Sequence, residues 1–493
     1  MRRLPEMRDL ADADLAAVES AASVCREYFS RRGYVRIETP LLEETELFLR
    51  KSGGELASRL YSFNEPGGYP VSLRPEYTAP ALRWAIETGA LAALPLRVQY
   101  CGPVFRHTPP SPGVAPVAGQ FTQLGAEIIG AGEPRADGEI ISMAWSGLNS
   151  LGLKSPRVVV GHVGLLWELL KPYGLSERAR LFLVNSVGLL REGKAGVGKV
   201  RDAAASLGLA PGLVETRKVA RTAARKVARI AETRKAARTD ALDDEKSLAL
   251  VESVLGETLG EPVARYSGTR TAEEIVARLA RKLTAADDPE KFGAALGLLA
   301  DMAVISGPVG KTLTQGRKVT KRASQDGAAF DRVEAVVSAA VDEGVPEDAI
   351  TADLGLARGI AYYTGMVFDL TAGDGAAKRP VGGGGRYDGL PRALGADRDA
   401  PALGFAYNMD AVAAAMPARA SGTAHALLVV PSDASAAKAA ATHAARLRER
   451  GETAIVEVDQ RGRAERERFA RSAGVRTIIT VSANGRISEE AVR

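Results

Sequence analysis

The chain has 493 residues and a net charge of +5, and its 46% hydrophobic and 25% charged residues are typical of a folded protein with two or three domains. No run of about 18 apolar residues exists and the N-terminal segment lacks an apolar core, so neither a membrane helix nor a secretion signal is expected. Two cysteines far apart and four scattered histidines exclude a disulfide framework and a metal-ligand spacing, so we expect a cytoplasmic protein without a metal site.

The N-terminal part of the chain predicts one long helix followed by short strands. Apolar residues at helical spacing predict a helix over 10–32, which Gly33 ends, and alternation predicts a strand at 34–40. A second helix is predicted over 76–89, because Pro75 stands just before its first turn. Further short strands are expected at 59–63, 69–73, 97–101 and 121–129.

The middle of the chain changes to a composition of alanine, leucine, arginine and glutamate, which predicts a helical insertion over 161–344. Its helices are expected at 163–172, 177–191, 215–239, 244–256, 271–284, 289–305 and 328–343. Strand character then returns at 350–372. A glycine-rich turn at 382–385 and a strand or helix through 402–415 follow it.

The basic character of the chain comes from one segment of this insertion. Residues 217–238 hold nine lysines and arginines and one glutamate, so the rest of the chain carries a net charge of −3. Arginines at every fourth position, from Arg217 to Arg229, would form a stripe along the helix predicted for 215–239. Two interpretations stay open: a solvent-exposed helix stabilised by its alanines, or a contact with RNA or an acidic partner.

A separate small domain is predicted beyond Gly422, over 423–493. Strands and helices alternate there in βαβαβ order, at 426–430, 434–450, 454–458, 463–473 and 475–481. This order favours a largely parallel sheet. The two segments 1–160 and 345–418 would form the main core.

One short stretch, at 358–369, places a cation, two phenols and a hydroxyl on an apolar segment. Arg358 beside Tyr362 and Tyr363 suits a ligand with a carboxylate and a ring. Taken alone, the stretch is explained equally well as a buried tyrosine-rich strand with a surface arginine. Further motifs accompany it: Leu-Arg-Pro-Glu-Tyr-Thr-Ala at 73–79, Gly-Pro-Val-Phe-Arg-His-Thr at 102–108 with 120–127, four glycines and Arg-Tyr-Asp at 382–388, and Leu-Gly-Phe-Ala-Tyr-Asn-Met-Asp at 403–410.

Together and in this order, these motifs resemble the core of class II aminoacyl-tRNA synthetases of the histidyl type and of their non-catalytic relatives, over roughly 1–130 and 350–415. The resemblance implies an α+β fold, in which an antiparallel sheet is flanked by helices. It also implies a homodimer, since 34–44 resembles the dimer-forming first motif, and it likens 423–493 to a shortened anticodon-binding domain.

The resemblance further implies a site for histidine. The expected contacts are Glu76 and Thr78 with the ammonium group, Gln123 and Arg358 with the carboxylate, and Glu127 and Tyr363 with the imidazole nitrogens, with Tyr362 beside them. Plainer readings stay open for Glu76, as a carboxylate at a helix start, and for Glu127, as an outward strand residue. The glycine run 382–385 is a weak match to a phosphate-binding loop, and it better suits a close approach of the backbone to the ligand. Arg386 and Asp388 are expected to pair with one another.

Several positions depart from the pattern of active synthetases. Arg106 matches the α-phosphate contact and is the expected phosphate-binding residue. The departures are Tyr77 for glycine, Thr108 for glutamate, Ala361 for aspartate and Ala411 for the arginine that grips the ATP tail. Since one lost transition-state contact costs about 10²–10³ in rate, catalysis and ATP binding are disfavoured, and no catalytic residue or cofactor is assigned.

The segment 160–180 resembles the regulatory subunit of ATP phosphoribosyltransferase more than a synthetase, and His162 in it is expected to make a structural contact. The preferred hypothesis is therefore a non-catalytic regulatory subunit for the first step of histidine biosynthesis. It would sense histidine as its effector and join a short-form catalytic subunit, as a homodimer within a hetero-oligomer. Two alternatives stay open, a divergent histidyl-tRNA synthetase and an RNA-binding synthetase paralogue, and the domain at 423–493 favours them.

Overall fold

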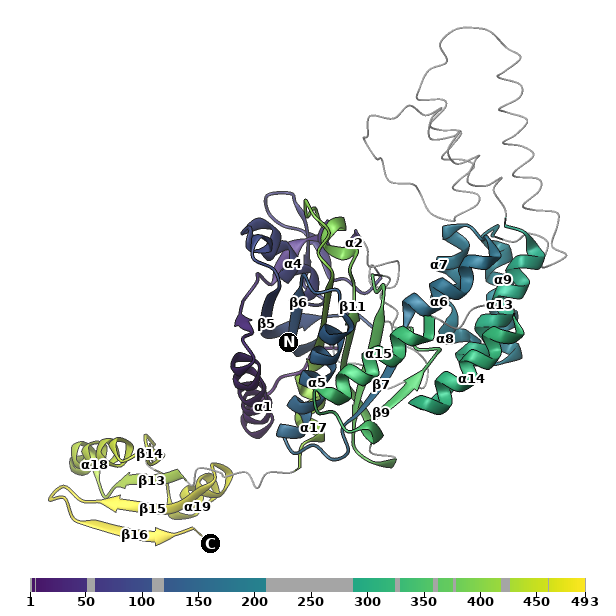
Figure 1. Ribbon diagram of the computed structural model, residues 1–493. Helices are drawn as coiled ribbons and strands as arrows, with labels where there is room; N and C mark the ends of the chain where they lie inside the picture. Colours follow the sequence, from purple (N-terminus) through teal and green to yellow (C-terminus); the bar gives the residue numbers. More distant parts are fainter. Residues whose placement is uncertain are drawn as a thin grey trace, which may run out of the picture. The chain divides into compact units, whose positions relative to one another are not determined.

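The computed structural model forms two compact units, Met1–Ala415 and Met416–Arg493 (Figure 1). The residues that it describes are 2–4, 6–50, 58–108, 119–209, 287–323, 329–357, 362–375, 378–417, 426–459 and 461–492. The basic run at 215–239, the helices expected at 244–256 and 271–284, and the site residue Arg358 lie outside the described residues.

A nine-stranded sheet is the centre of the first unit. Its strands, in spatial order, are β1 (Val35–Arg36), β5 (Leu96–Phe105), β6 (Gln120–Ile129), β12 (Ala402–Asn408), β11 (Arg379–Arg386), β10 (Met366–Ala372), β7 (Arg157–His162), β9 (Ile350–Asp353) and β8 (Ser306–Pro308). Neighbouring strands are antiparallel except for the pairs β1–β5 and β7–β9. The predicted α+β class with an antiparallel sheet is confirmed.

Helices flank this sheet and a small second sheet lies near its β5 side. The helices are α1 (Asp12–Arg31), α2 (Thr45–Leu49), α4 (Thr78–Glu87), α5 (Pro134–Ser150), α15 (Ala329–Asp342), α16 (Leu390–Ala393) and α17 (Met409–Ala415). The small antiparallel sheet has the order β2 (Leu42–Glu44), β4 (Pro70–Leu73) and β3 (Ser62–Asn64). The helix predicted at 10–32 is confirmed as α1, which buries Val18, Cys25 and Phe29 on one face.

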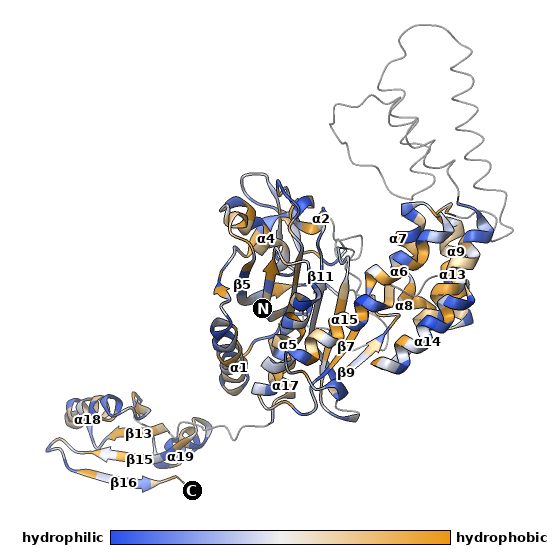
Figure 2. Cartoon of the chain, viewed as in Figure 1, coloured by the Kyte–Doolittle hydropathy of each residue, from blue (hydrophilic) through white to orange (hydrophobic). Residues whose placement is uncertain are grey.

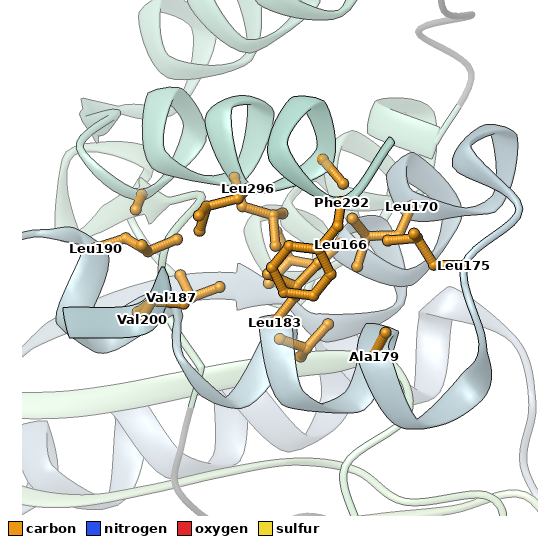
Figure 3. Packing of buried hydrophobic residues seen from close by; sticks show 14 of the residues in the cluster. Leu166, Leu170, Leu175, Ala179, Leu183, Val187, Leu190, Val200, Phe292 and Leu296 are labelled. Atoms are coloured by element: carbon orange, nitrogen blue, oxygen red, sulfur yellow. The ribbon is translucent and has the colours of Figure 1, made fainter. Parts of the chain in front are cut away.

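A layer of helices packs beside β7 and β10 (Figure 1). Its members are α6 (Val163–Leu170), α7 (Glu177–Asn185), α8 (Val187–Leu190), α9 (Lys194–Ser206), α13 (Pro289–Ala303) and α14 (Val309–Arg322). Leu166, Leu183 and Phe292 are fully buried where these helices meet (Figure 3), and Val367 of β10 belongs to the same cluster. The apolar sides of these helices therefore face one another and the sheet (Figure 2).

The second unit has the strand order β14 (Ala454–Val456), β13 (Ala426–Pro431), β15 (Val475–Val481) and β16 (Ile487–Ala491). Its helices are α18 (Ala437–Glu449) and α19 (Arg463–Ser472). β13 is parallel to β14 and β15, which confirms the βαβαβ order. The antiparallel strand β16 was missed because all five of its residues are exposed and show no alternation of apolar and polar residues.

The prediction of a glycine-rich turn at 382–385 is wrong, because these residues lie within β11. β11 lies between β10 and β12, and a Cβ on Gly384 would collide with the backbone of β12. The glycines therefore serve close strand packing, which a local reading of the run as a turn does not consider.

The short helices α2 and α16 were missed, and so were the longer helices α5, α9 and α14, each of which contains two glycines. A Cβ on Gly138 of α5 would lie 2.6 Å from the Cβ of Ala339, so this glycine lets α5 approach α15 closely. The helix expected at 177–191 is two helices, α7 and α8, which meet at Ser186. The domain bounds expected for the core, the insertion and 423–493 stay predictions. None of the described helices is both long and apolar enough to cross a membrane.

Candidate functional site

One pocket of about 310 Å³ collects most of the site residues expected from the sequence. Glu76 and Thr78 reach it from the start of α4, and Gln123 reaches it from β6. Tyr362, Tyr363 and Arg106 also line it. Lining residues as far apart in sequence as Arg59 and Asn408 thus meet in one place, because β6, β12 and β11 are consecutive strands of the sheet.

Glu127 lies directly behind this pocket, on β6, and is only 1% exposed. Its Oε1 accepts hydrogen bonds from Thr78 Oγ1 and Tyr100 Oη, both at 2.8 Å, and its Oε2 accepts one from Tyr387 Oη. The reading of Glu127 as an outward strand residue is therefore wrong. We call Glu127, Thr78, Tyr100 and Tyr387 the Glu127 cluster.

Burial determines the protonation of this cluster. It raises the pKa of Glu127 to about 7, although the three hydroxyl donors act in the opposite direction. Burial also raises the pKa of Tyr100 and of Tyr387 well above their usual range, so both phenols keep their protons and donate them. Thr78 and Tyr387 line the pocket and direct their hydrogens at Glu127, so their oxygen lone pairs are acceptors for a ligand.

Glu76 caps the start of α4. Its carboxylate accepts the backbone N–H groups of Thr78 and of Ala79, the latter at 3.1 Å. Burial raises the pKa of Glu76, and the two N–H groups and Arg106 counteract it. The plainer reading of Glu76 as a helix-start carboxylate thus describes its geometry, and the same side chain lines the pocket.

Gln123 is oriented by the backbone of its neighbour. Its Oε1 accepts a hydrogen bond from the N–H of Tyr77 at 3.0 Å. With the carbonyl oxygen used in this way, Gln123 presents an NH₂ group, which is a donor that suits a carboxylate.

Cations line the pocket at Arg59 and Arg106, and we call these two residues with Thr108 the arginine cluster. Arg106 Nε donates to the carbonyl oxygen of Pro75 at 2.7 Å, and its guanidinium carbon lies 5.2 Å from the ring centre of Phe121. Arg59 was missed by sequence reasoning, because an isolated arginine outside every motif gives no sign of its place.

Three tyrosine rings form an aromatic wall of the pocket. The ring centre of Tyr362 lies 4.9 Å from that of Tyr363 and 5.6 Å from that of Tyr387. Tyr387 was missed as a site residue although it stands in the Arg-Tyr-Asp motif. Arg386 pairs with Asp388 as expected, but its main partner is Asp137 of α5, at 2.7 Å.

Comparisons with known proteins match the part of the chain that contains these pocket residues. The family model described as "Histidyl-tRNA synthetase" matches residues 6–264 and 269–412, which is more than half of the chain. The chain belongs to the histidyl-tRNA synthetase family. A histidine–tRNA ligase of Methanocaldococcus jannaschii is 27% identical over 82% of this chain and 73% of the relative. One of Prochlorococcus marinus is 38% identical over 33% of this chain and 39% of the relative.

Solved structures of this family have the same fold. A Bacillus halodurans protein described as an ATP phosphoribosyltransferase regulatory subunit/histidyl-tRNA synthetase has a TM-score of 0.65 and 20% identity, with 98% of each chain covered. A histidyl-tRNA synthetase of Nostoc has a TM-score of 0.59 and 15% identity, with 99% of this chain and 96% of that chain covered. These likenesses confirm the class II synthetase-like fold.

The departures from the synthetase pattern have distinct places in this histidyl-tRNA synthetase-like fold. Ala411 lies in the first turn of α17, and the preceding Asp410 accepts the N–H of Thr122 at 2.8 Å and pairs with Arg8. Thr108 lines the pocket. Ala361, like Arg358, lies outside the described residues.

Tyr77, which stands where the synthetase pattern has glycine, lies outside the pocket. Its fully buried ring is stacked on Tyr100 and is not among the residues that line the pocket, so it does not narrow the pocket. The replacement of the pattern's glycine by Tyr77 therefore does not fill the pocket.

His162 makes a structural contact, as expected. Its Nδ1 accepts the N–H of Leu165 at 3.0 Å and caps α6, and burial lowers its pKa to about 4, which keeps the ring neutral. Among the described residues, no group of three histidine, cysteine or acidic side chains could hold a metal ion.

Proposed function

We propose that this chain binds free histidine without activating it, as the regulatory subunit of ATP phosphoribosyltransferase in the first step of histidine biosynthesis. The observation that supports the proposal most is a contrast within one pocket. Glu76, Thr78 and Gln123 meet there in front of Glu127, whereas Ala411 offers no cation where the synthetase pattern has an arginine.

The polar groups of the pocket fit the ammonium and ring of histidine. An ammonium group would meet the carboxylate of Glu76 and the hydroxyl oxygen of Thr78. The imidazole of free histidine has a pKa near 6.5, close to the pKa of about 7 of Glu127, so a proton can be held between ligand and cluster near neutral pH. Such a charge-assisted contact is about twice as strong as a neutral one.

Activation of histidine would need cations that hold the triphosphate of ATP and stabilise its developing charge. Arg59 and Arg106 line the pocket, but Ala411 and Thr108 are neutral. We infer that ATP is not held in a productive position, and that histidine is released unchanged.

As a regulator, the chain would act through linkage. Bound histidine would favour one arrangement of the complex with a short-form catalytic subunit, and would lower its activity if that arrangement is less competent. A coupling of about 1–3 kcal/mol is typical of such systems. The chain would take part as a homodimer within this hetero-oligomer.

Calorimetry with histidine, followed by a histidine-dependent exchange of pyrophosphate into ATP, tests the proposal. We expect histidine binding, no exchange, and a gain of activity when a short phosphoribosyltransferase is added. The matched control ligand is histidinol. It lacks the carboxylate to which the NH₂ group of Gln123 would donate a hydrogen bond, so it should bind more weakly. Brisk exchange, or a complete lack of histidine binding, would overturn the proposal.

A divergent histidine–tRNA ligase is the second candidate. It is favoured by the relatives named histidine–tRNA ligase, which match 82% of the chain, and by the second compact unit at Met416–Arg493. Arg59 adds a cation to the pocket that the motifs did not indicate. The pyrophosphate exchange assay, followed by an assay of histidine charging onto transfer RNA, decides between the two functions.

A further inference from the structure

Tyr77, which stands where the synthetase pattern has glycine, is part of a stack of three buried side chains. The rings of Tyr77 and Tyr100 are parallel within 4°, with their centres 4.4 Å apart. The guanidinium carbon of Arg74 lies 3.9 Å from the centre of the Tyr77 ring. All three side chains are at most 1% exposed, so the stack is closed to solvent.

Two glycines provide the space for this stack. A Cβ on Gly102 would collide with Tyr77 Oη and would lie 2.7 Å from Arg74 Nη2. A Cβ on Gly125 would lie 2.6 Å from Tyr100 Oη. Both glycines stand on the paired strands β5 and β6, where Tyr100 is the register partner of Gly125, so the backbone is shaped around the rings.

The two ends of the stack have defined polar contacts. At one end, Tyr77 Oη donates to Glu38 Oε1 at 3.0 Å, and Arg74 Nη1 donates to Glu38 and to the carbonyl oxygen of Thr39. At the other end, Tyr100 Oη donates to Glu127 Oε1 at 2.8 Å. A continuous path of contacts therefore joins the segment at 38–39 to the carboxylate behind the pocket.

We propose that Tyr77 is a positioning residue, which holds the Tyr100 hydroxyl on Glu127 and ties the Glu127 cluster to the segment at 38–39. With glycine at 77, one face of the Tyr100 ring would border an empty space as large as a phenol ring, and the ring could move away from Glu127. With Tyr77 in place, the Tyr100 ring cannot move in this way, and its hydroxyl stays in position to donate to Glu127. The ligand-binding part of this inference rests on the proposed binding of histidine.

A double-mutant cycle tests the proposal. Tyr77→Met removes the planar ring but fills most of its volume, and Tyr100→Phe keeps the stack but removes the hydroxyl. Each single variant should weaken histidine binding by about tenfold, as expected for one hydrogen bond to a charged group. If Tyr77 acts through the Tyr100 hydroxyl, the double variant should bind as Tyr100→Phe does. Additive losses would overturn the proposal and leave Tyr77 as ordinary core packing.

Three further variants make the cycle decisive. Tyr77→Phe keeps the ring and loses only the hydrogen bond to Glu38, so it should weaken histidine binding less than Tyr77→Met does. Phe330→Leu removes a fully buried ring between α14 and α15 and should leave the affinity unchanged, which controls for general loss of stability. If Tyr77→Met does not fold, Gly102→Ala displaces the Tyr77 ring without removing it and should weaken binding in the same direction.

A measurement without ligand separates this inference from the proposed function. The Tyr100 hydrogen bond lowers the pKa of Glu127 against the effect of burial. The other groups that act on Glu127 or face it are Thr78, Glu76, Tyr362 and Tyr387. Loss of Tyr77 or of the Tyr100 hydroxyl should therefore raise the Glu127 pKa, measured by carbon-13 NMR of the glutamate carboxyl. If wild type binds no histidine, the proposed function fails, whereas the inference then still fails or stands by this pKa: it fails if Tyr100→Phe raises the pKa and Tyr77→Met leaves it unchanged.

Discussion

The Glu127 cluster and the arginine cluster line or back the same pocket but differ in burial and in how their polar groups are satisfied. Glu127, Tyr100 and Tyr387 are at most 2% exposed and both phenols donate hydrogen bonds to the Glu127 carboxylate, whereas Arg59 and Arg106 are half-buried. Electrostatic contacts are stronger where water is excluded. The difference teaches that one side of this pocket is backed by buried, hydrogen-bonded groups, whereas its cations lie closer to solvent.

The largest expected effect comes from the support of the Glu127 cluster. Asp137 is 3% exposed and accepts two hydrogen bonds from Arg386, which precedes Tyr387. Asp137→Ala would leave a buried guanidinium without its main partner, and should lower the free energy of unfolding by about 3–5 kcal/mol in urea denaturation. The matched control is Asp331→Ala, which removes an exposed partner of Arg317 and should change stability by less than about 1 kcal/mol. A loss below 1 kcal/mol for both variants would show that the cluster does not depend on this ion pair.

The next effect is a dependence of stability on pH. The folded protein keeps the Glu127 carboxyl protonated up to a pKa of about 7, whereas the unfolded chain releases this proton near pH 4.5. The free energy of unfolding should therefore fall by about 3 kcal/mol as pH rises from 4.5 to 7, and stay level above that, relative to Glu127→Gln. Identical pH profiles of wild type and Glu127→Gln would show that the carboxyl titrates normally.

A slightly smaller effect concerns ligand affinity. Glu127→Gln should keep the chain folded and lower its affinity for histidine by about 100-fold in calorimetry above the Glu127 pKa of about 7, since the charged acceptor of three hydroxyl groups is lost. Glu334→Gln, on the exposed side of α15, serves as the control and should bind normally. Retained affinity in Glu127→Gln would place the ligand elsewhere.

The smallest effect is expected in the arginine cluster. Arg59→Ala should change the affinity for histidine by no more than about twofold, because a half-buried cation in contact with solvent contributes little to a ligand held in the Glu127 cluster. A loss as large as that of Glu127→Gln would show that the two clusters act as one site.

The helices of the first unit illustrate what local patterns predict. The apolar spacing of α1, α6, α13 and α15 led to helices within a few residues of their observed bounds, because each helix buries one continuous face. The helices with internal glycines, such as α14, were missed because their stability comes from tertiary packing rather than from helix propensity.

The candidate site also contains residues that local motifs indicated and residues that only the fold brings together. The order of short motifs led to Glu76, Thr78 and Gln123, which line one pocket, and to Glu127 directly behind it. Tyr387 was missed as a donor to Glu127, because the two residues are 260 positions apart and only the sheet brings them together.

By itself, the sequence determined the α+β class, the family and six of the residues that line the pocket, since motifs and periodicity act over a few neighbouring residues. Only the tertiary structure decided that the glycines at 382–385 form a central strand, that Glu127 faces inward, and that the Tyr77 ring is stacked on Tyr100 outside the pocket. These features depend on which distant segments pack together, and burial then sets the charge and hydrogen bonding of each side chain.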